Sequence, residues 1–142
     1  MDTSIVKFIT EHHLLTLATS NNNIPYCCNV FYVFNEETNS LIFATDTKTN
    51  HAQHFIENPK VAGSIALETL DIEKIQGVQL LGTIKELKRE ELINAKNQYL
   101  EVFAYAETMN PKLWIMTLTF IKMTHNKLGF GKKLIWEKKV NE

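Results

Sequence analysis

The sequence predicts a mainly β fold with flanking helices (α+β), in which an antiparallel sheet of six to seven strands is closed or nearly closed. The chain contains six or seven stretches with strand character but only three with helical character. These stretches do not alternate as β-α-β repeats, which argues against a parallel sheet. One long strand, Ile75–Leu87, contains two glycines, and glycines let strands bend where a small barrel turns its corners.

The length and composition indicate a single globular domain over residues 1–142. Hydrophobic residues make up 44% of the chain and charged residues 22%, which is ordinary for such domains. The net charge of −1 predicts no broad surface for nucleic acid or membrane. The N-terminal residues do not resemble a signal peptide, and no stretch approaches the roughly 18 apolar residues of a membrane span. We therefore expect a cytoplasmic protein.

The first two elements are a helix and a strand. Apolar residues at helical spacing predict the helix over Asp2–His12. The strand is predicted over Leu14–Thr19, and the cluster of Ser and Asn residues after it is typical of a turn.

The second strand, Pro25–Phe34, is apolar on both faces apart from Asn29, so it should be covered on both sides. A buried Asn29 would bond either to backbone groups or to a ligand, and backbone is favoured because most buried side-chain bonds go there or to water. Cys27 and Cys28 are adjacent and point to opposite faces of this strand. We expect two small buried residues that share neither a metal nor a disulfide.

The next stretch carries the most chemistry. An apolar strand, Leu41–Thr45, runs into polar residues that open a short helix, Asn50–Glu57, which ends before Pro59. The first N–H groups of a helix lack intrahelical partners, and the helix dipole is positive there, so the place suits a phosphate. An ordinary turn, rich in Thr and Asn because these residues cap helices, is the alternative. The hydrogen-bonding side chains are those of Thr45, Thr47, Lys48, Thr49, Asn50 and His51.

The longest helix is predicted over Arg89–Glu107, and Pro111 prevents it from extending further. The remaining predicted elements are strands over Val61–Leu67, Ile75–Leu87, Leu113–Thr124 and Leu128–Trp136.

Several familiar kinds of site are poorly supported. His51 and His54 could share a helix face, but a metal site needs three or four ligands and the sequence offers two. There is no Gly-x-Ser-x-Gly, and Cys28 lies in the middle of a strand rather than at a turn. The run Gly129-Phe130-Gly131 lacks the third glycine and the following helix of a dinucleotide site.

The run from Phe43 to Val61 resembles the FMN-phosphate segment of the pyridoxamine 5′-phosphate oxidase-like split-barrel proteins. In that family a strand ending in Thr is followed by Ser-Arg-Lys-Ala, which opens a helix that closes with Asn-Pro-Arg-Val. The strand with Gly77–Gly82 looks like the family's following strand, and Leu128–Trp136 looks like a signature of one uncharacterised bacterial branch. The order of elements matches over nearly the whole chain.

The resemblance includes departures. Thr49 stands where the oxidases have Ser, Asn50 stands at the Arg position and His51 at the Lys position, while Lys48 can restore positive charge. Asn29 falls where the oxidases have another flavin-contacting Arg. The oxidases' C-terminal substrate-binding segment is not recognisable, so pyridoxamine phosphate is not the expected substrate.

The resemblance implies a split-barrel homodimer with two FMN molecules in clefts between the subunits. It implies an FMN-dependent oxidoreductase that acts on a small molecule, with NAD(P)H as a candidate electron donor. The alternative is a non-catalytic flavin or haem carrier, with His51, His54 or His125 available as a haem ligand. The implied FMN-binding residues are Asn29, Val30, Phe31, Thr45, Lys48, Thr49, Asn50, His51, Gln79, Lys132 and Trp136, with Gln79 and the Gly129–Trp136 strand assigned to the second subunit.

Overall fold

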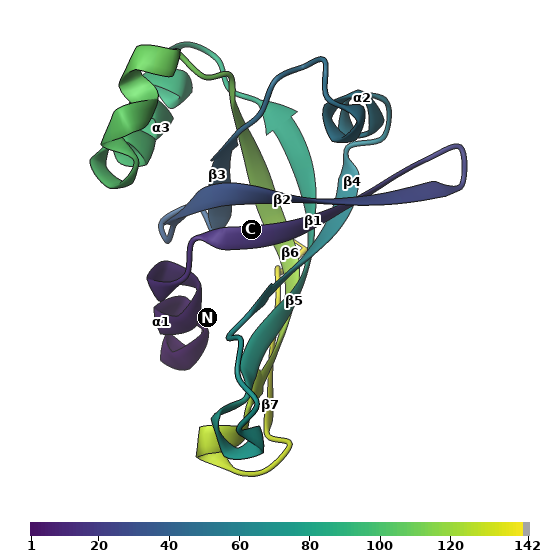
Figure 1. Ribbon diagram of the computed structural model, residues 1–142, viewed down its shortest axis with the longest axis vertical. Helices are drawn as coiled ribbons and strands as arrows, with labels where there is room; N and C mark the ends of the chain where they lie inside the picture. Colours follow the sequence, from purple (N-terminus) through teal and green to yellow (C-terminus); the bar gives the residue numbers. More distant parts are fainter. Residues whose placement is uncertain (141–142) are drawn as a thin grey trace.

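The computed structural model describes residues 1–140 and shows one sheet with helices around it (Figure 1). In chain order the elements are α1 (Thr3–Glu11), β1 (Leu14–Asn21), β2 (Ile24–Asn35), β3 (Ser40–Ala44), α2 (Asn50–Glu57), β4 (Lys60–Ala66), η1 (Ile72–Lys74), β5 (Gln76–Glu86), α3 (Arg89–Val102), η2 (Ala104–Met109), β6 (Leu113–His125), η3 (Asn126–Leu128) and β7 (Lys133–Glu137), where η marks a 3₁₀ helix. Within residues 1–140 no helix combines the length and the apolar character needed to cross a membrane.

The sheet closes into a barrel. Its seven strands follow the order β3-β2-β1-β4-β5-β6-β7, and every neighbouring pair is antiparallel. β3, the first strand in this order, also pairs with β6, from Ser40 opposite Thr117 to Ala44 opposite Leu113. This pairing closes the sheet into the barrel. β7 extends the sheet beyond β6. The predicted class, an antiparallel split barrel with helices outside it, is confirmed.

A bulge in β6 lies opposite one of the two glycines of β5, because Thr119 is left without a partner there. The register of β5 against β6 shifts between Leu81 and Gly82. A Cβ atom on Gly82 would lie only 2.6 Å from the backbone oxygen of Thr117, so a larger residue does not fit without movement of the neighbouring strand. The glycine therefore allows the close approach of strands that a small barrel needs.

The barrel interior holds the larger of two hydrophobic cores. Leu15, Leu17 and Tyr32 are completely buried in it. The Tyr32 hydroxyl donates a hydrogen bond of 2.7 Å to the Ile9 oxygen, which ties α1 to the barrel. Burial raises the pKa of Tyr32 well above its usual value. The second core lies between α3 and the sheet and includes Tyr99.

α2 has the bounds predicted from the sequence and is clamped on the barrel by Phe55. The Phe55 side chain is 2% exposed. Its ring centroid lies 4.8 Å from that of Trp114 and 6.0 Å from that of Phe43, both in edge-on geometry. Three aromatic rings therefore fix the position of the helix that follows β3.

The longest helix is shorter than predicted, and its expected extent, Arg89–Glu107, is wrong. α3 ends at Val102, and the backbone leaves helical geometry at Phe103 with φ −118° and ψ 65°. The Phe103 ring packs against Tyr99 and Phe31, with centroids 4.9 and 5.7 Å apart. Contact with a strand distant in sequence accompanies the break, and helical periodicity alone cannot reveal such a contact.

The expected last strand, Leu128–Trp136, is wrong in its first half. β7 begins only at Lys133. Gly129 and Gly131 have φ values of 148° and 70°, a backbone region that glycine adopts far more readily than other residues. The glycine-rich run therefore forms the turn that reverses the chain onto β6.

Within one chain β2 is covered on one side only, so the expected cover of its second face, part of which a partner subunit would supply, stays a prediction. Phe31 is 50% exposed, and Cys27 is also exposed. Cys28 is partly buried, and this burial raises the pKa of its thiol to about 11. Asn29 is exposed too, and its Oδ1 accepts a hydrogen bond from the Thr16 hydroxyl at 2.9 Å rather than from the backbone. The alternation of residues shows that both faces of this strand are apolar, but it does not show what covers each of them.

Candidate functional site

The end of β3 is anchored to β6. The Thr45 N–H donates to the Lys112 oxygen, and the Trp114 Nε1–H donates to the Thr45 oxygen, both at 3.1 Å. The Lys112 ammonium lies 5.4 Å from the centre of the Trp114 ring and also pairs with the Glu86 carboxylate. These bonds determine where the loop into α2 begins.

The loop before α2 is folded around Asp46. Its carboxylate accepts from the Lys48 N–H at 2.8 Å, and its carbonyl accepts from the Thr49 N–H at 3.2 Å and the Thr49 hydroxyl at 2.9 Å. The Thr49 Oγ in turn accepts from the Ala52 N–H at 3.2 Å and so caps the helix. The exposed side chains at this turn include those of Lys48 and Asn50.

His51 faces the hydroxyl groups of two threonines. Its Nε2 lies 2.5 Å from the Thr45 Oγ and 3.2 Å from the Thr49 Oγ. Partial burial of the ring lowers the pKa of His51 below its usual value of 6.5, because desolvation disfavours the charged imidazolium. The structure thus brings together three of the residues predicted for the phosphate site.

We expect His51 to reduce the stability of the protein in mild acid. Its pKa is lower in the folded chain than the unfolded value of about 6.5, so the unfolded state binds more protons as the pH falls through that value, and the free energy of unfolding decreases. A His51→Gln variant should lose this part of the pH dependence. Urea denaturation from about pH 5 to 8 measures the effect, with the exposed His13→Gln as a matched control. Parallel profiles for the wild type and His51→Gln would contradict the coupling.

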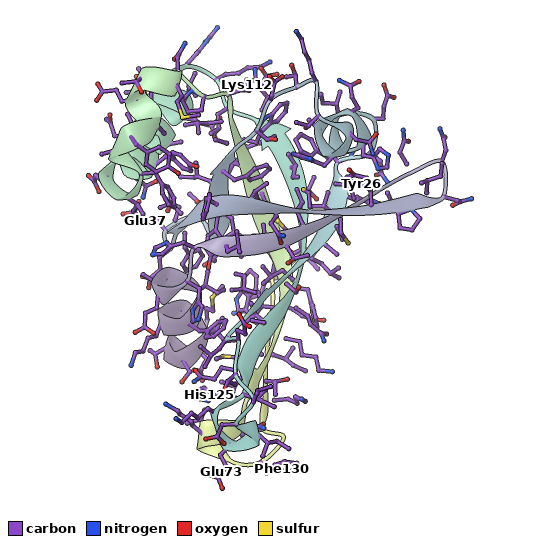
Figure 2. The ribbon with its side chains drawn as sticks, in the orientation of Figure 1. Tyr26, Glu37, Glu73, Lys112, His125 and Phe130 are labelled. Atoms are coloured by element: carbon purple, nitrogen blue, oxygen red, sulfur yellow. The ribbon has the colours of Figure 1, made fainter. Side chains whose placement is uncertain are left out.

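α2 is also held against the β1–β2 hairpin. The His54 Nδ1 lies 3.1 Å from the Thr19 Oγ, and its ring meets that of Tyr26 at 5.8 Å between centroids. The Asn58 Nδ2–H donates to the Ser20 oxygen at 2.9 Å. Figure 2 shows Tyr26 beside α2. The helix therefore bridges the end of β3 and the β1–β2 hairpin.

Asn29 and Gln79 lie in one cross-strand row on the outer surface of the barrel. The register places Asn29 opposite Thr16, Thr16 opposite Ser64, and Ser64 opposite Gln79. At about 4.8 Å per strand, three steps separate the two predicted residues by roughly 14 Å. Both are exposed, so β2 and β5 present them on a common face.

Three other residues predicted to bind FMN have side chains that lie apart from these two groups. Val30 is 6% exposed and belongs to the barrel core, so only its backbone is placed for contact with a ligand outside the barrel. Lys132 is exposed in the turn before β7, which lies at the opposite end of the molecule from α2, and Figure 2 labels Phe130 of this turn there. Trp136 lines a small cavity beside the β2–β3 turn with residues that include Glu37. A single chain therefore does not bring Lys132 and Trp136 to the start of α2.

Sequence reasoning missed Trp114, Thr16 and the role of His54. A tryptophan within a strand needs a partner for its N–H, and this was the available signal for Trp114. Thr16 becomes a partner of Asn29 only through strand register, which no local pattern reveals. His54 bonds to a threonine on β1. Among residues 1–140 no group of three His, Cys, Asp or Glu side chains is arranged to hold a metal ion.

The family profile described as pyridoxamine 5′-phosphate oxidase matches residues 1–127 of the chain. A UPF0306 protein from Yersinia enterocolitica is 37% identical over 134 residues, and the match covers 94% of this chain and 91% of that protein.

Two solved structures have the same fold. A haem-binding protein from Mycobacterium smegmatis has a TM-score of 0.78 at 16% identity over 96% of this chain, which spans 59% of that longer protein. A FAD-binding protein from Mesorhizobium loti has a TM-score of 0.72 at 11% identity, over 87% of this chain and 94% of that one. The shared architecture agrees with the match of the profile over most of the sequence. This split-barrel chain belongs to the pyridoxamine 5′-phosphate oxidase family.

Proposed function

We propose that this protein binds FMN with its phosphate at the start of α2 and acts as an FMN-dependent oxidoreductase on a small molecule, with NAD(P)H as the electron donor. One observation carries the proposal. Thr45, Thr49 and His51 meet at a helix N-terminus, where the exposed Lys48 adds a positive charge. Membership of this family supports a flavin as the cofactor.

The groups at this junction fit a phosphate monoester. The Lys48 ammonium supplies a fixed charge, and the Asn50 and His51 N–H groups belong to the first turn of the helix, where intrahelical partners are absent. The helix dipole adds to the positive potential. His51 becomes a second cation only when it is protonated, and its lowered pKa places that event on the acid side of 6.5 in the free protein. The proposed site therefore has one permanent and one pH-dependent positive charge.

The flavin ring would lie along the outer face that carries Asn29. The Asn29 Oδ1 already accepts a hydrogen bond from the Thr16 hydroxyl. The NH₂ group of Asn29 therefore remains to donate to an oxygen at the pyrimidine edge of the flavin. The backbone of Val30 and the exposed Phe31 follow along the same strand. When it is bound, FMN supplies hydride or electron transfer, and the protein orients the ring and adjusts its electronic properties.

We further propose a homodimer with the flavin between the subunits. The outer face that carries Asn29 also exposes large apolar side chains, with Leu14 50%, Phe31 50% and Leu81 49% exposed. Two small residues, Ala62 and Ala18, lie in the same cross-strand row as Leu81. Exposed apolar surface of this kind favours a protein partner, and a second copy could also bring Gln79, Lys132 and Trp136 to the flavin.

A charge on this face should disrupt the dimer. Leu81→Glu would bury an unpaired carboxylate in the proposed interface, so we expect the variant to be monomeric and to bind FMN poorly. Light scattering and analytical ultracentrifugation measure the mass. Ile93→Glu is the matched control, because Ile93 is 60% exposed but lies on α3. A wild-type monomer, or a Leu81→Glu variant that remains dimeric, would contradict the proposed interface.

Titration with FMN, FAD and riboflavin tests the proposed function. FMN should bind most tightly, because its terminal phosphate fits the start of α2, whereas FAD would have to pass its adenylyl half beyond Lys48 and His51. Protein loaded with FMN should bleach on addition of NAD(P)H and recover its absorbance when it reduces a small electrophile. Equal affinity for FAD and FMN would contradict the phosphate placement, and a lack of flavin binding would contradict the function.

A non-catalytic carrier of flavin or haem is the second candidate. The haem-binding protein from Mycobacterium smegmatis shares the fold over nearly the whole of this chain, and this similarity supports haem as a candidate ligand beside flavin. A carrier would bind its ligand without turnover of NAD(P)H. A Soret band on addition of haemin, together with absence of flavin binding, would favour the haem carrier over the oxidoreductase.

A further inference from the structure

The hydroxyl group of Thr49 has partners for all but one of its bonding positions. A threonine hydroxyl has one proton and two lone pairs. The Thr49 proton is donated to the Asp46 carbonyl at 2.9 Å, and one lone pair accepts from the Ala52 N–H at 3.2 Å. The His51 Nε2 lies 3.2 Å from the same oxygen. The second lone pair of Thr49 is therefore what faces His51.

This lone pair requires a proton on the His51 Nε2. An unprotonated Nε2 would present a lone pair of its own, and two lone pairs at this distance repel each other. The Thr45 Oγ lies 2.5 Å from the same nitrogen, so a protonated Nε2 can share its hydrogen between the two threonine oxygens in a three-centre bond. A neutral imidazole carries a single N–H. The contacts therefore favour the neutral tautomer that has its proton on Nε2.

The surroundings of the other ring nitrogen agree with this tautomer. In residues 1–140 no group bonds to the His51 Nδ1, which is open to solvent rather than buried. Water can donate to an unprotonated nitrogen there. Partial burial of the ring lowers the pKa of His51, so the neutral ring predominates near neutral pH. The ring also lies against Phe55, with 6.4 Å between centroids.

The tautomer determines which proton the Thr45 hydroxyl can offer to a ligand. Because the Thr45 Oγ accepts from the His51 Nε2–H, its own proton is not donated to the ring, and no other group in residues 1–140 accepts it. Thr45 is partly exposed. Its backbone is fixed by bonds to the Lys112 oxygen and the Trp114 Nε1–H. The end of β3 therefore presents a free hydroxyl proton at a defined place beside the start of α2.

We propose that neutral His51, through its Nε2–H, positions the Thr45 hydroxyl so that this hydroxyl donates its proton to an oxygen of the FMN phosphate. The inference rests on the proposed function and gives His51 a positioning role that needs no charge on the ring. Thr49 accepts the other branch of the same bond, and its proton can turn from the Asp46 carbonyl to the phosphate. The hydroxyl groups and the ring then present donors alone, which suits the acceptor oxygens of a phosphate.

NMR of the free protein tests the tautomer. Long-range ¹H–¹⁵N spectra at about pH 8, above the usual imidazole pKa of about 6.5, distinguish the protonated from the unprotonated ring nitrogen. The His51→Gln variant assigns the signals. We expect the proton of His51 on Nε2, and a proton on Nδ1 would overturn the proposal. No flavin is needed, so this result is independent of whether the proposed function is correct.

A double-mutant cycle tests whether His51 acts through Thr45. Thr45→Val removes the hydroxyl from a side chain of similar shape and should weaken FMN binding by about tenfold, as expected for a lost bond to a charged group. His51→Leu should cause a loss of the same order. Because both changes remove the same contact, the double variant should bind about as weakly as either single variant. Losses that multiply to about a hundredfold would show that His51 acts independently of Thr45 and would overturn the proposal.

Conservative variants and riboflavin are the controls. Thr45→Ser keeps the hydroxyl, and His51→Gln can place an amide N–H where the Nε2–H lies, so each should restore most of the lost affinity. Riboflavin has no phosphate and should bind equally to all these variants. If riboflavin binding fell as much as FMN binding, His51 and Thr45 would only support the fold, and the positioning role would be wrong. If the wild type bound no flavin, the proposed function would fail, while the spectrum of the free protein would still decide the tautomer.

Discussion

Replacing Lys48 and Thr49 together by alanine should weaken FMN binding by roughly 2–4 kcal/mol, while riboflavin binding should hardly change. The double variant loses one charge-assisted hydrogen bond, worth about 1.5–3 kcal/mol. It also loses one neutral bond, worth about 0.5–1.5 kcal/mol, which the Thr49 hydroxyl makes to the phosphate when its proton turns away from the Asp46 carbonyl. Riboflavin has no phosphate, so it makes neither contact. Fluorescence titration of both ligands measures the difference in binding free energy.

The capping role of Thr49 requires a further control. Because its Oγ accepts from the Ala52 N–H, Thr49→Ala should also cost about 1 kcal/mol of stability. A Lys48→Ala/Thr49→Ser variant keeps a capping hydroxyl and isolates the lost charge. Equal loss of affinity for FMN and riboflavin in the alanine double variant would show that these residues do not contact the phosphate.

Phe55→Ala should reduce the free energy of unfolding by about 3–5 kcal/mol, as expected for an aromatic residue removed from a core. The side chain is 2% exposed and packs edge-on against Phe43 and Trp114. Removing it leaves a cavity beneath α2 and loosens the helix that forms the proposed phosphate site. FMN affinity should therefore fall together with stability, as measured by urea denaturation and flavin titration.

Two other substitutions test whether packing is the cause. Phe55→Leu keeps much of the apolar volume and should cost less than Phe55→Ala. Phe130→Ala removes the same kind of side chain from a position that is 82% exposed, and it should change stability by no more than about 0.5 kcal/mol. If Phe55→Ala and Phe130→Ala had similar effects, the aromatic cluster would not be what holds α2 in place.

The sequence by itself determined the local structure around α2. The helix has its predicted bounds, Asn50–Glu57, because both end signals are local: Thr49 caps the first turn, and Pro59 prevents continuation. The gathering of Thr45, Thr49 and His51 was also predictable, since these residues are close in sequence. The fold class followed from the number of strands, the absence of β-α-β order and the resemblance to a known family.

Strand pairing across the sheet decided the rest of the site. Asn29 and Gln79 share an outer row only because β1 and β4 lie between their strands in a particular register. The pattern of β2 showed two apolar faces, yet which of them fills the barrel depends on closure by the pairing of β3 with β6.

Contacts between residues distant in sequence also explain why the predicted bounds of two elements, α3 and β7, were wrong. α3 breaks at Phe103, whose ring packs against Phe31 on β2, and the glycine-rich run before β7 turns the chain onto β6. Helix caps and prolines act over a few residues, so they can be read along the chain. Barrel closure, cross-strand neighbours and ring packing join residues far apart in the sequence, so only the tertiary structure could establish them.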